Sequence, residues 1–140
     1  MRITPCTQAD LADWTALRRA LWPDAEDPAA MLAEPEQLAL IARDDADAAL
    51  GFAEAAIRHD YVNGCDSAPV LFLEGIYVAP AWRRHGIARA LAEHVAQWGR
   101  AFGCSEFASD ALLDNSDSHT VHAALGFAET ERVVYFHRRL

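Results

Sequence analysis

The sequence predicts an α/β domain in which a mixed central sheet of about six to seven strands is flanked by about four helices. Three observations predict this fold class. Residues Leu71 to Val78 form an apolar strand that stops at Pro80 and is followed by a helix from Ile87. Two further apolar runs, Gln37 to Arg43 and Ala49 to His59, are joined by an acidic turn and are expected to pair as strands. Segments with helical spacing alternate with these strands along the chain.

The composition indicates one globular domain spanning residues 1–140, because 52% of the residues are hydrophobic and 24% are charged. No apolar run is long enough to span a membrane, and no N-terminal signal pattern is visible. Cys6, Cys65 and Cys104 are odd in number and too widely spaced for a disulfide framework or a zinc site. We therefore expect reduced thiols, no bound metal and a cytoplasmic location.

The net charge of −9 lies entirely in the first half of the chain. Residues 1–74 carry 14 acids and 5 arginines, whereas residues 75–140 carry 7 of each. A nucleic-acid-binding protein needs a basic face, and none is visible, so we expect no nucleic-acid partner. An acidic half suits a cationic substrate held by carboxylates, or it simply keeps a small protein soluble. Charge alone leaves both interpretations open.

Local signals place the remaining elements. Thr7 to Asp10 forms a capping box that starts a helix, whose apolar residues recur at helical spacing until Pro23. The same spacing turns Arg18 and Arg19 outward. The other expected elements are a strand at Arg2 to Pro5, a short helix at Ala29 to Ala33, a helix at Ile87 to Arg100 ended by Gly103, a strand at Ser105 to Asp110, a short helix from Asn115 to Gly126, and one or two strands within Ala128 to Arg138.

The turn after the central strand has the features of an anion site. Gly86 lets the backbone turn tightly and approach a ligand, and the N–H groups at the start of the following helix point outward. Arg83, Arg84 and Arg89 add positive charge around this turn. An ordinary strand–helix turn with a solvated basic edge is the alternative. The strand before it and the helix after it favour a loop that binds cofactor phosphates.

Glu74 is the one charged residue inside the apolar central strand. Because a buried acid costs free energy without a partner, we expect Glu74 to be buried at a cleft and to act as a base near neutral pH; alternatively it faces water.

The free backbone groups of Ile76 to Val78 suit pairing with an extended amide chain. Asp110 either caps the following segment or faces the ligand edge, and Trp22 either packs in the core or forms a pocket wall.

Two separated motifs resemble the GNAT acetyltransferases. Arg83-x-x-Gly86-x-Ala88 after a strand is similar to their pyrophosphate loop, and the helix from Asn115 that ends in Leu125-Gly126-Phe127 is similar to their second cofactor helix. The resemblance implies a GNAT fold with acetyl-CoA as co-substrate. The residues that it implies for cofactor binding are Ile76, Tyr77, Val78, Arg84, His85, Gly86, Ile87, Ala88, Arg89 and Asn115.

Five further segments look like the aminoglycoside 6′-N-acetyltransferases: Leu21 to Pro23, Ile57 to Asp66, Phe72 to Ile76, Ala108 to Asp110 and His122 to Arg132. The likeness implies direct acetyl transfer to the 6′-amine in a ternary complex, antibiotic resistance and a homodimer. The residues implied at the substrate site are Trp22, Tyr61, Glu74, Asp110 and Glu131. Glu74 is implied as a catalytic residue, and so is His122, although many members carry a tyrosine there that protonates the departing thiolate. His122 therefore either takes this role or is structural.

The chain departs from these relatives in two places, so other acceptors of the acetyl group stay open. Relatives often carry a histidine where this chain has Ala25, and the chain is several residues shorter before Gln37. The alternative acceptors are a polyamine, a metabolite amine or a protein amine. Because the chain has His122 where many members carry a tyrosine, a domain that binds acetyl-CoA without catalysing transfer is a further interpretation.

Overall fold

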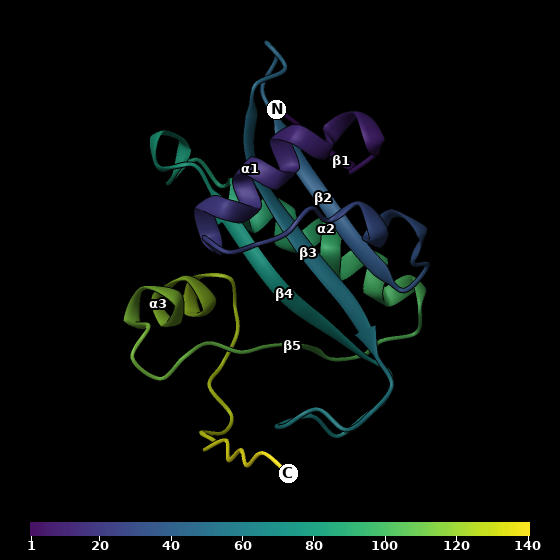
Figure 1. Ribbon diagram of the computed structural model, residues 1–140, viewed down its shortest axis with the longest axis vertical. Coiled ribbons are helices and arrows are strands. Elements are labelled where there is room, and N and C mark those ends of the chain that lie inside the picture. The colour runs from purple at the N-terminus through teal and green to yellow at the C-terminus, as the bar shows by residue number, and fades with distance from the viewer.

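A computed structural model describes all residues from 1 to 140 (Figure 1). Its strands are β1 (Arg2–Pro5), β2 (Gln37–Arg43), β3 (Ala49–Arg58), β4 (Val70–Val78) and β5 (Phe107–Ser109), and its α-helices are α1 (Leu11–Leu21), α2 (Ile87–Ala101) and α3 (Ser116–Ala124). The strands lie side by side in sequence order. The pairs from β1 to β4 are antiparallel, and β5 joins β4 in parallel, so the sheet is mixed.

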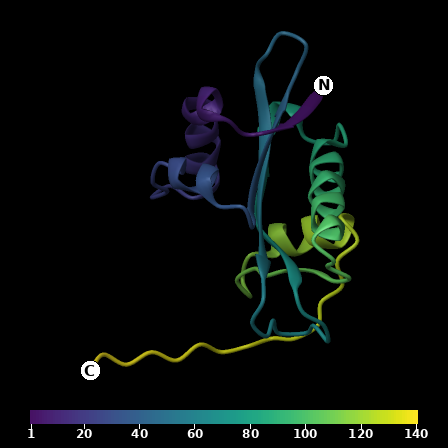
Figure 2. The ribbon, with the colours of Figure 1, turned by 90° about the vertical axis from the view of Figure 1, so that its right-hand side faces the viewer.

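The sheet is covered on both faces, with α1 on one side and α2 on the other (Figure 2). Helix α2 buries Ile87, Leu91 and Val95 at helical spacing against β3 and β4, as predicted. Helix α1 buries Trp14 and Leu17 in a second cluster on the opposite face of the sheet. Since both faces are covered, the middle strands are apolar throughout rather than alternating.

The predicted fold class is confirmed, and two details of the prediction differ. The sheet has five strands, fewer than the six to seven expected, because Ala128 to Arg138 forms no strand. An extended segment becomes a strand only when its N–H and C=O groups find a partner, and the last backbone hydrogen bond of the chain is donated by Phe127. There are three α-helices and not four, because Ala29–Ala33 forms a 3₁₀ helix.

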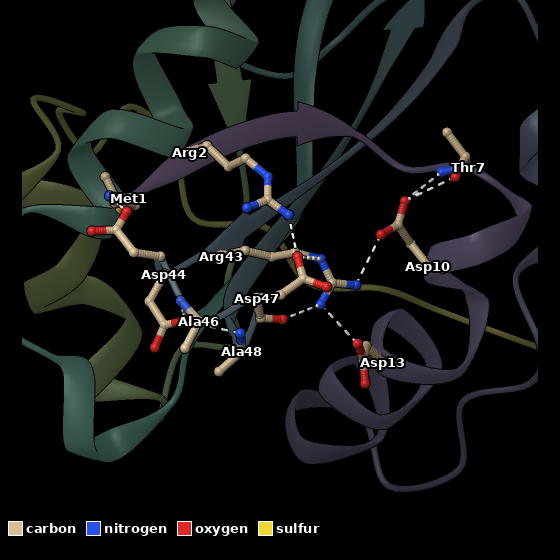
Figure 3. Close-up of polar contacts among 11 residues, drawn as sticks. Met1, Arg2, Thr7, Asp10, Asp13, Arg43, Asp44, Ala46, Asp47 and Ala48 are labelled. Atoms are coloured by element: carbon tan, nitrogen blue, oxygen red, sulfur yellow. Dashed lines mark hydrogen bonds and ion pairs between the residues drawn. The ribbon is translucent and has the colours of Figure 1, made fainter.

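A buried arginine joins β2 to the start of α1 (Figure 3). Arg43 is only 7% exposed, and its guanidinium donates to Asp10 and to Asp13 at 2.8 Å each, and to the Asp47 carbonyl at 2.8 Å. Asp10 also accepts from the backbone N–H of Thr7 at 2.9 Å, which completes the predicted capping box. Spacing alone gave no signal for Arg43, because its two carboxylate partners, Asp13 and Asp10, are 30 and 33 residues away in sequence.

The Arg43 cluster makes stability depend on pH. Burial raises the pKa of Asp10, but the hydrogen bonds from Arg43 and Thr7 outweigh it and hold the pKa below the ordinary value of 3.8. A lowered pKa means that the stabilisation is fully present above pH 3.8 and is lost as the pH falls through the folded-state pKa. We expect Asp10→Asn to lower the free energy of unfolding by about 2 kcal/mol at pH 7 and by much less at pH 3. Urea unfolding at both pH values measures this, with exposed Asp24→Asn as the control; an equal loss at both would contradict it.

Candidate active site

The pairing of β4 changes at Glu74. Glu54 lies opposite Gly75 and Ala55 lies opposite Leu73, so Glu74 is the extra residue of a β-bulge with no partner on β3. On the other side, β5 pairs only with Leu71 to Leu73. Beyond Leu73 the outer edge of β4 therefore has no neighbouring strand, and a ligand can pair with it up to Val78, whose carbonyl already accepts from Arg83 Nε at 3.0 Å.

An open cavity of about 340 Å³ lies beside this bulge. Its lining consists of Arg18, Trp22, Met31, Gln37, Glu54, Ala55, Ala56 and Glu74. Trp22 is both packed and exposed to the cavity, since its ring meets Phe52 edge-on at 5.9 Å between centroids. Gly75 makes this possible, because a Cβ there would lie 2.3 Å from Cη2 of Trp22. The two interpretations of Trp22 that the sequence left open are thus both realised.

Glu74 faces solvent at the cavity, so the expectation that it is buried is wrong. The bulge turns it to the sheet surface, where the Arg58 guanidinium donates to its two oxygens at 3.0 and 3.3 Å. Arg58 in turn lies 3.5 Å above the ring centroid of Phe72. The side chains of Arg58 and Glu74 are 42% and 36% exposed, and exposed ion pairs contribute about 0–1 kcal/mol. A ligand ammonium group can therefore replace Arg58 beside Glu74 at little cost.

Glu54 is a second carboxylate of the cavity, which the sequence analysis missed. It is 2% exposed, accepts from the Trp14 indole at 2.8 Å, and accepts from Arg18 Nε at 2.6 Å. The expectation that Arg18 turns outward is wrong, because its charge is needed to compensate the buried acid. The signal was the same as for Glu74: a lone acid inside an apolar strand.

The acidic surface continues past this cavity. A second cavity of about 300 Å³ shares Gln37 and Ala56 with the first and adds Glu34 and Glu36 to its lining. Glu36 lies 2.7 Å from His59 Nε2. The two cavities together present three accessible carboxylates, those of Glu34, Glu36 and Glu74, while Glu54 is buried and paired with Arg18. This arrangement attracts a ligand with several positive charges.

The turn between β4 and α2 has the geometry of an anion site. Arg84 and Gly86 have left-handed backbones, with φ of 66° and 76°. The backbone N–H groups of residues 84–89 donate to no protein acceptor. A Cβ on Gly86 would meet nothing within 4 Å, so the loop surface is open. Six unpaired donors at a helix N-terminus fit the diphosphate of a nucleotide cofactor.

Helix α3 lies beside this turn, because Arg89 donates to the Ala124 carbonyl at 3.3 Å. Asn115 caps α3 by accepting from the Ser118 N–H at 3.2 Å, as the sequence predicted for a helix start. His122 Nδ1 lies 2.7 Å from the Ser118 carbonyl oxygen, and its Nε2 lies 2.7 Å from Ser109 Oγ, which donates to the Leu73 carbonyl. His122 is thus held at the point where β4 and β5 part.

The structure does not bring all predicted substrate residues together. Trp22 and Glu74 line the cavity, whereas Tyr61, Asp110 and Glu131 line neither cavity. Tyr61 is 75% exposed on the loop between β3 and β4, Asp110 is exposed just after β5, and Glu131 is exposed in the C-terminal segment. Their roles stay predictions.

The structure brings together no group of three or more histidine, cysteine, aspartate or glutamate side chains suited to a metal ion. None of its helices combines the length and the apolar character needed to cross a membrane.

Comparisons with known proteins agree with this geometry. The sequence profile of the acetyltransferase (GNAT) family matches residues 6–127. The chain is 49% identical over 145 residues to the aminoglycoside N(6′)-acetyltransferase type 1 of Acinetobacter baumannii, covering 100% of this chain and 99% of the relative. It superposes with a TM-score of 0.97 on the ligand-free crystal structure of the aminoglycoside 6′-N-acetyltransferase of Acinetobacter haemolyticus, at 48% identity over 100% of this chain and 99% of that one.

A third relative was solved with a ligand. The protein named AAC(6′)-Iy, in complex with the bisubstrate analogue CoA-S-monomethyl-acetylneamine, matches with a TM-score of 0.92 and 46% identity. The match covers 99% of this chain and 98% of that protein.

Proposed function

This chain belongs to the acetyltransferase (GNAT) family, and we propose that it transfers the acetyl group of acetyl-CoA to the 6′-amine of aminoglycoside antibiotics, conferring resistance. The observation that carries this proposal is the acidic cavity of Glu54 and Glu74, which lies directly beside the free outer edge of β4. A polycationic acceptor and an extended thioester arm would meet there. Residues 1–140 would act as one domain in the cytoplasm, where its three free cysteines stay reduced.

Acetyl-CoA supplies the acetyl group as a thioester, and three parts of the chain fit its binding. The unpaired N–H groups of residues 84–89, including those of Arg84, His85, Ile87 and Ala88, would hold the diphosphate. The free edge of β4 from Ile76 through Tyr77 to Val78 would pair with the pantetheine amides as an added strand. Asn115 uses only its side-chain oxygen in capping α3, so its amide N–H groups are left for the same arm.

The cavity would orient the acceptor amine and take its proton. Ammonium groups would lie along the carboxylates of Glu34, Glu36 and Glu74, with Trp22 packed against the sugar ring. Glu74 would accept the proton of the attacking 6′-ammonium, directly or through water, once that group replaces Arg58. The free amine would then form the C–N bond as the C–S bond breaks, and holding both substrates side by side would supply most of the acceleration.

His122 is proposed to return a proton to the departing thiolate. His122 Nδ1 lies 2.7 Å from the Ser118 carbonyl oxygen, and its Nε2 lies 2.7 Å from Ser109 Oγ, which donates to the Leu73 carbonyl. Because β5 pairs with β4 only as far as Leu73, His122 lies close to the edge of β4 along which the thioester arm is proposed to bind.

Direct transfer, without an acetyl-cysteine intermediate, fits the raised pKa values of the three cysteines. Burial raises the pKa of Cys6 to about 12, and burial is also the first cause that raises the pKa of Cys65 and of Cys104. The thiolate is the nucleophilic form, so these thiols are poor nucleophiles, and none of them lines the cavity. An acetyl-cysteine trapped during turnover would contradict direct transfer.

Two glycines at opposite ends of α2 test the phosphate loop. Gly86 and Gly103 have similar left-handed φ values of 76° and 83°, and both have open space around them. We expect Gly86→Ala and Gly103→Ala each to cost about 1 kcal/mol in the free energy of unfolding. Only Gly86→Ala is expected to weaken acetyl-CoA binding, by about 10-fold, because a shift of one or two donors loses about 1.4 kcal/mol. Isothermal titration calorimetry measures this; equal affinities of the two variants would count against the loop.

An acceptor panel tests the choice of substrate. Purified protein with acetyl-CoA is offered kanamycin, tobramycin, spermidine and a lysine peptide, and thiol release is recorded for each. We expect turnover on the two aminoglycosides at a kcat/KM well above that of the other amines. Turnover on spermidine or peptide alone would replace the aminoglycoside with one of those acceptors and would leave the chemistry unchanged.

We further propose that the protein works as a homodimer. The support is a C-terminal segment whose large apolar side chains are exposed in the single chain, including Val134 at 77%, Tyr135 at 81% and Phe136 at 93%. A run of exposed large apolar side chains of this kind is typical of an interface.

A further inference from the structure

A positively charged side chain of the protein itself lies on the accessible carboxylate of the first cavity. Arg58 is the last residue of β3, and one nitrogen of its guanidinium donates to both oxygens of Glu74, at 3.0 and 3.3 Å. Side chains alternate along a strand, so Arg58 lies on the same face of β3 as Glu54 and Ala56, which line the cavity. An ammonium group that is to contact Glu74 must therefore take the place of Arg58.

Phe72 holds the guanidinium in this position. The Cζ atom of Arg58 lies 3.5 Å from the centroid of the Phe72 ring. The ring is itself fixed, because Phe72 is 4% exposed and packs in a buried cluster with Val62 and Val70. A planar guanidinium stacks well on such a ring, and the contact limits the freedom of its long side chain. Arg58 is thus kept beside Glu74 and is a steady competitor for that carboxylate.

The two arginine–glutamate pairs of the cavity differ in their access to water. In the pair of Arg18 with Glu54 the side chains are 18% and 3% exposed, and separating them would leave a buried charge uncompensated. In the pair of Arg58 with Glu74 they are 42% and 36% exposed, so water can solvate each group once the pair opens. The first pair is fixed in the fold, whereas the second can be exchanged for a ligand.

We propose that Arg58 determines which acceptors the cavity selects, because it cancels the attraction of Glu74 for a single ammonium group. The inference rests on the proposed function. When one ammonium replaces Arg58, one exposed ion pair is lost as another forms, so the exchange adds little charge attraction. An acceptor then gains electrostatic affinity only through further ammonium groups. Glu34 is available to them because it takes part in no ion pair, and Glu36 because it pairs only with His59.

This competition favours polycationic acceptors over amines with one charge. A monoamine has only the ammonium group that replaces Arg58, and it finds no net attraction in the cavity. An acceptor with several ammonium groups pairs with the remaining carboxylates and draws its reacting amine to Glu74. Arg58 lowers the affinity for both kinds of acceptor, but only the polycation has other charges that compensate this loss.

Binding of kanamycin to Arg58→Met tests the competition. Methionine keeps an apolar stem over Phe72 and removes the charge. We expect the Kd for kanamycin to fall about threefold, since an exposed ion pair corresponds to at most about fivefold in an equilibrium constant. Calorimetry with saturating coenzyme A, which carries no acetyl group, measures this. The control is Arg100→Met, which makes the same change of net charge at an exposed pair with Glu93 and should bind as the wild type does.

The dependence of binding on salt separates competition from a structural role of Arg58. The probe is 6-amino-6-deoxyglucose, a sugar with one ammonium group, titrated by NMR in NaCl from about 0.1 to 1 M, over which the screening length falls from about 10 to 3 Å. In the wild type one pair replaces another, so we expect its Kd to change little with salt. In Arg58→Met binding creates a new pair, and its Kd is expected to rise clearly with salt. Equal salt dependence in the two proteins would overturn the proposal.

Thiol release separates failure of the competition from failure of the proposed function. We expect kcat on kanamycin to stay within about twofold of the wild type in Arg58→Met, because Arg58 has left Glu74 before the proton is taken. Turnover by the wild type with an unchanged or raised Kd in Arg58→Met would defeat the competition and leave the function standing. Tighter binding in the variant with no thiol release from either protein would do the reverse. No kanamycin binding to either protein would overturn both.

Discussion

Glu74→Gln is expected to lower kcat about 1,000-fold while the Kd for acetyl-CoA changes less than about twofold, since a positioned general base supplies about 10²–10⁴-fold. Glutamine keeps the size of the side chain and its place at the bulge, but it takes no proton from the attacking amine. The anion loop at residues 84–89 is separate from the cavity that Glu74 lines, which is why cofactor binding should be unaffected. Stopped-flow thiol release and calorimetry measure the two quantities.

Glu93→Gln is the matched control for this experiment. Glu93 is an exposed acid on α2 that pairs with Arg100 at 3.0 Å, far from the cavity lining. We expect its kcat to equal that of the wild type. If Glu74→Gln kept wild-type turnover, Glu74 would not be the base, and Glu54 would be the next carboxylate of the cavity to test.

Arg18→Met is expected to lower the free energy of unfolding by about 3 kcal/mol, because it leaves a buried carboxylate without its countercharge. Glu54 is 2% exposed, and Arg18 Nε lies 2.6 Å from its Oε1. The Trp14 indole would remain as a donor but carries no charge. Chemical unfolding followed by circular dichroism measures the loss.

The neighbouring arginine supplies the control for Arg18. Arg19 is exposed and donates only to the Ala25 carbonyl at 3.2 Å, so Arg19→Met should change stability by less than about 0.5 kcal/mol. The double variant Arg18→Met/Glu54→Gln should recover much of the loss, because it removes the uncompensated charge as well. Equal losses for Arg18→Met and Arg19→Met would show that the pair does not stabilise the fold.

The elements that sequence predicted best are those with strong local signals. The predicted strands Arg2 to Pro5 and Gln37 to Arg43 have the bounds that the structure gives, and the predicted Leu71 to Val78 differs by one residue from β4 (Val70–Val78), because apolar runs end there at proline or at acidic turns. The capping box at Thr7 and the glycine stops around α2 are local as well. The segment after Phe127 was predicted as strand from composition, but it forms no backbone hydrogen bond in the structure. Local pattern gives strand propensity, whereas a strand also requires a neighbour.

The site was predicted less completely than the fold, because it depends on contacts between distant residues. The loop around Gly86 was found from adjacent residues, and its open donors match the expectation. Glu74 was found as a lone acid in a strand, but its exposure follows from a bulge that spacing does not reveal. Arg18 and Glu54 are 36 residues apart, so neither could be assigned to the other from sequence. Arg58 on β3 likewise contacts Glu74 on the neighbouring β4, 16 residues away in sequence.

The central claim is that the acidic cavity presents a 6′-amine to the acetyl thioester. Its most direct test is thiol release from acetyl-CoA with a pair of aminoglycosides that differ only in a 6′-amine or a 6′-hydroxyl. The account predicts rapid turnover with the amine and none with the hydroxyl analogue, although both should bind the same carboxylates. Equal turnover on both members of the pair, or turnover on neither while acetyl-CoA still binds, would contradict it.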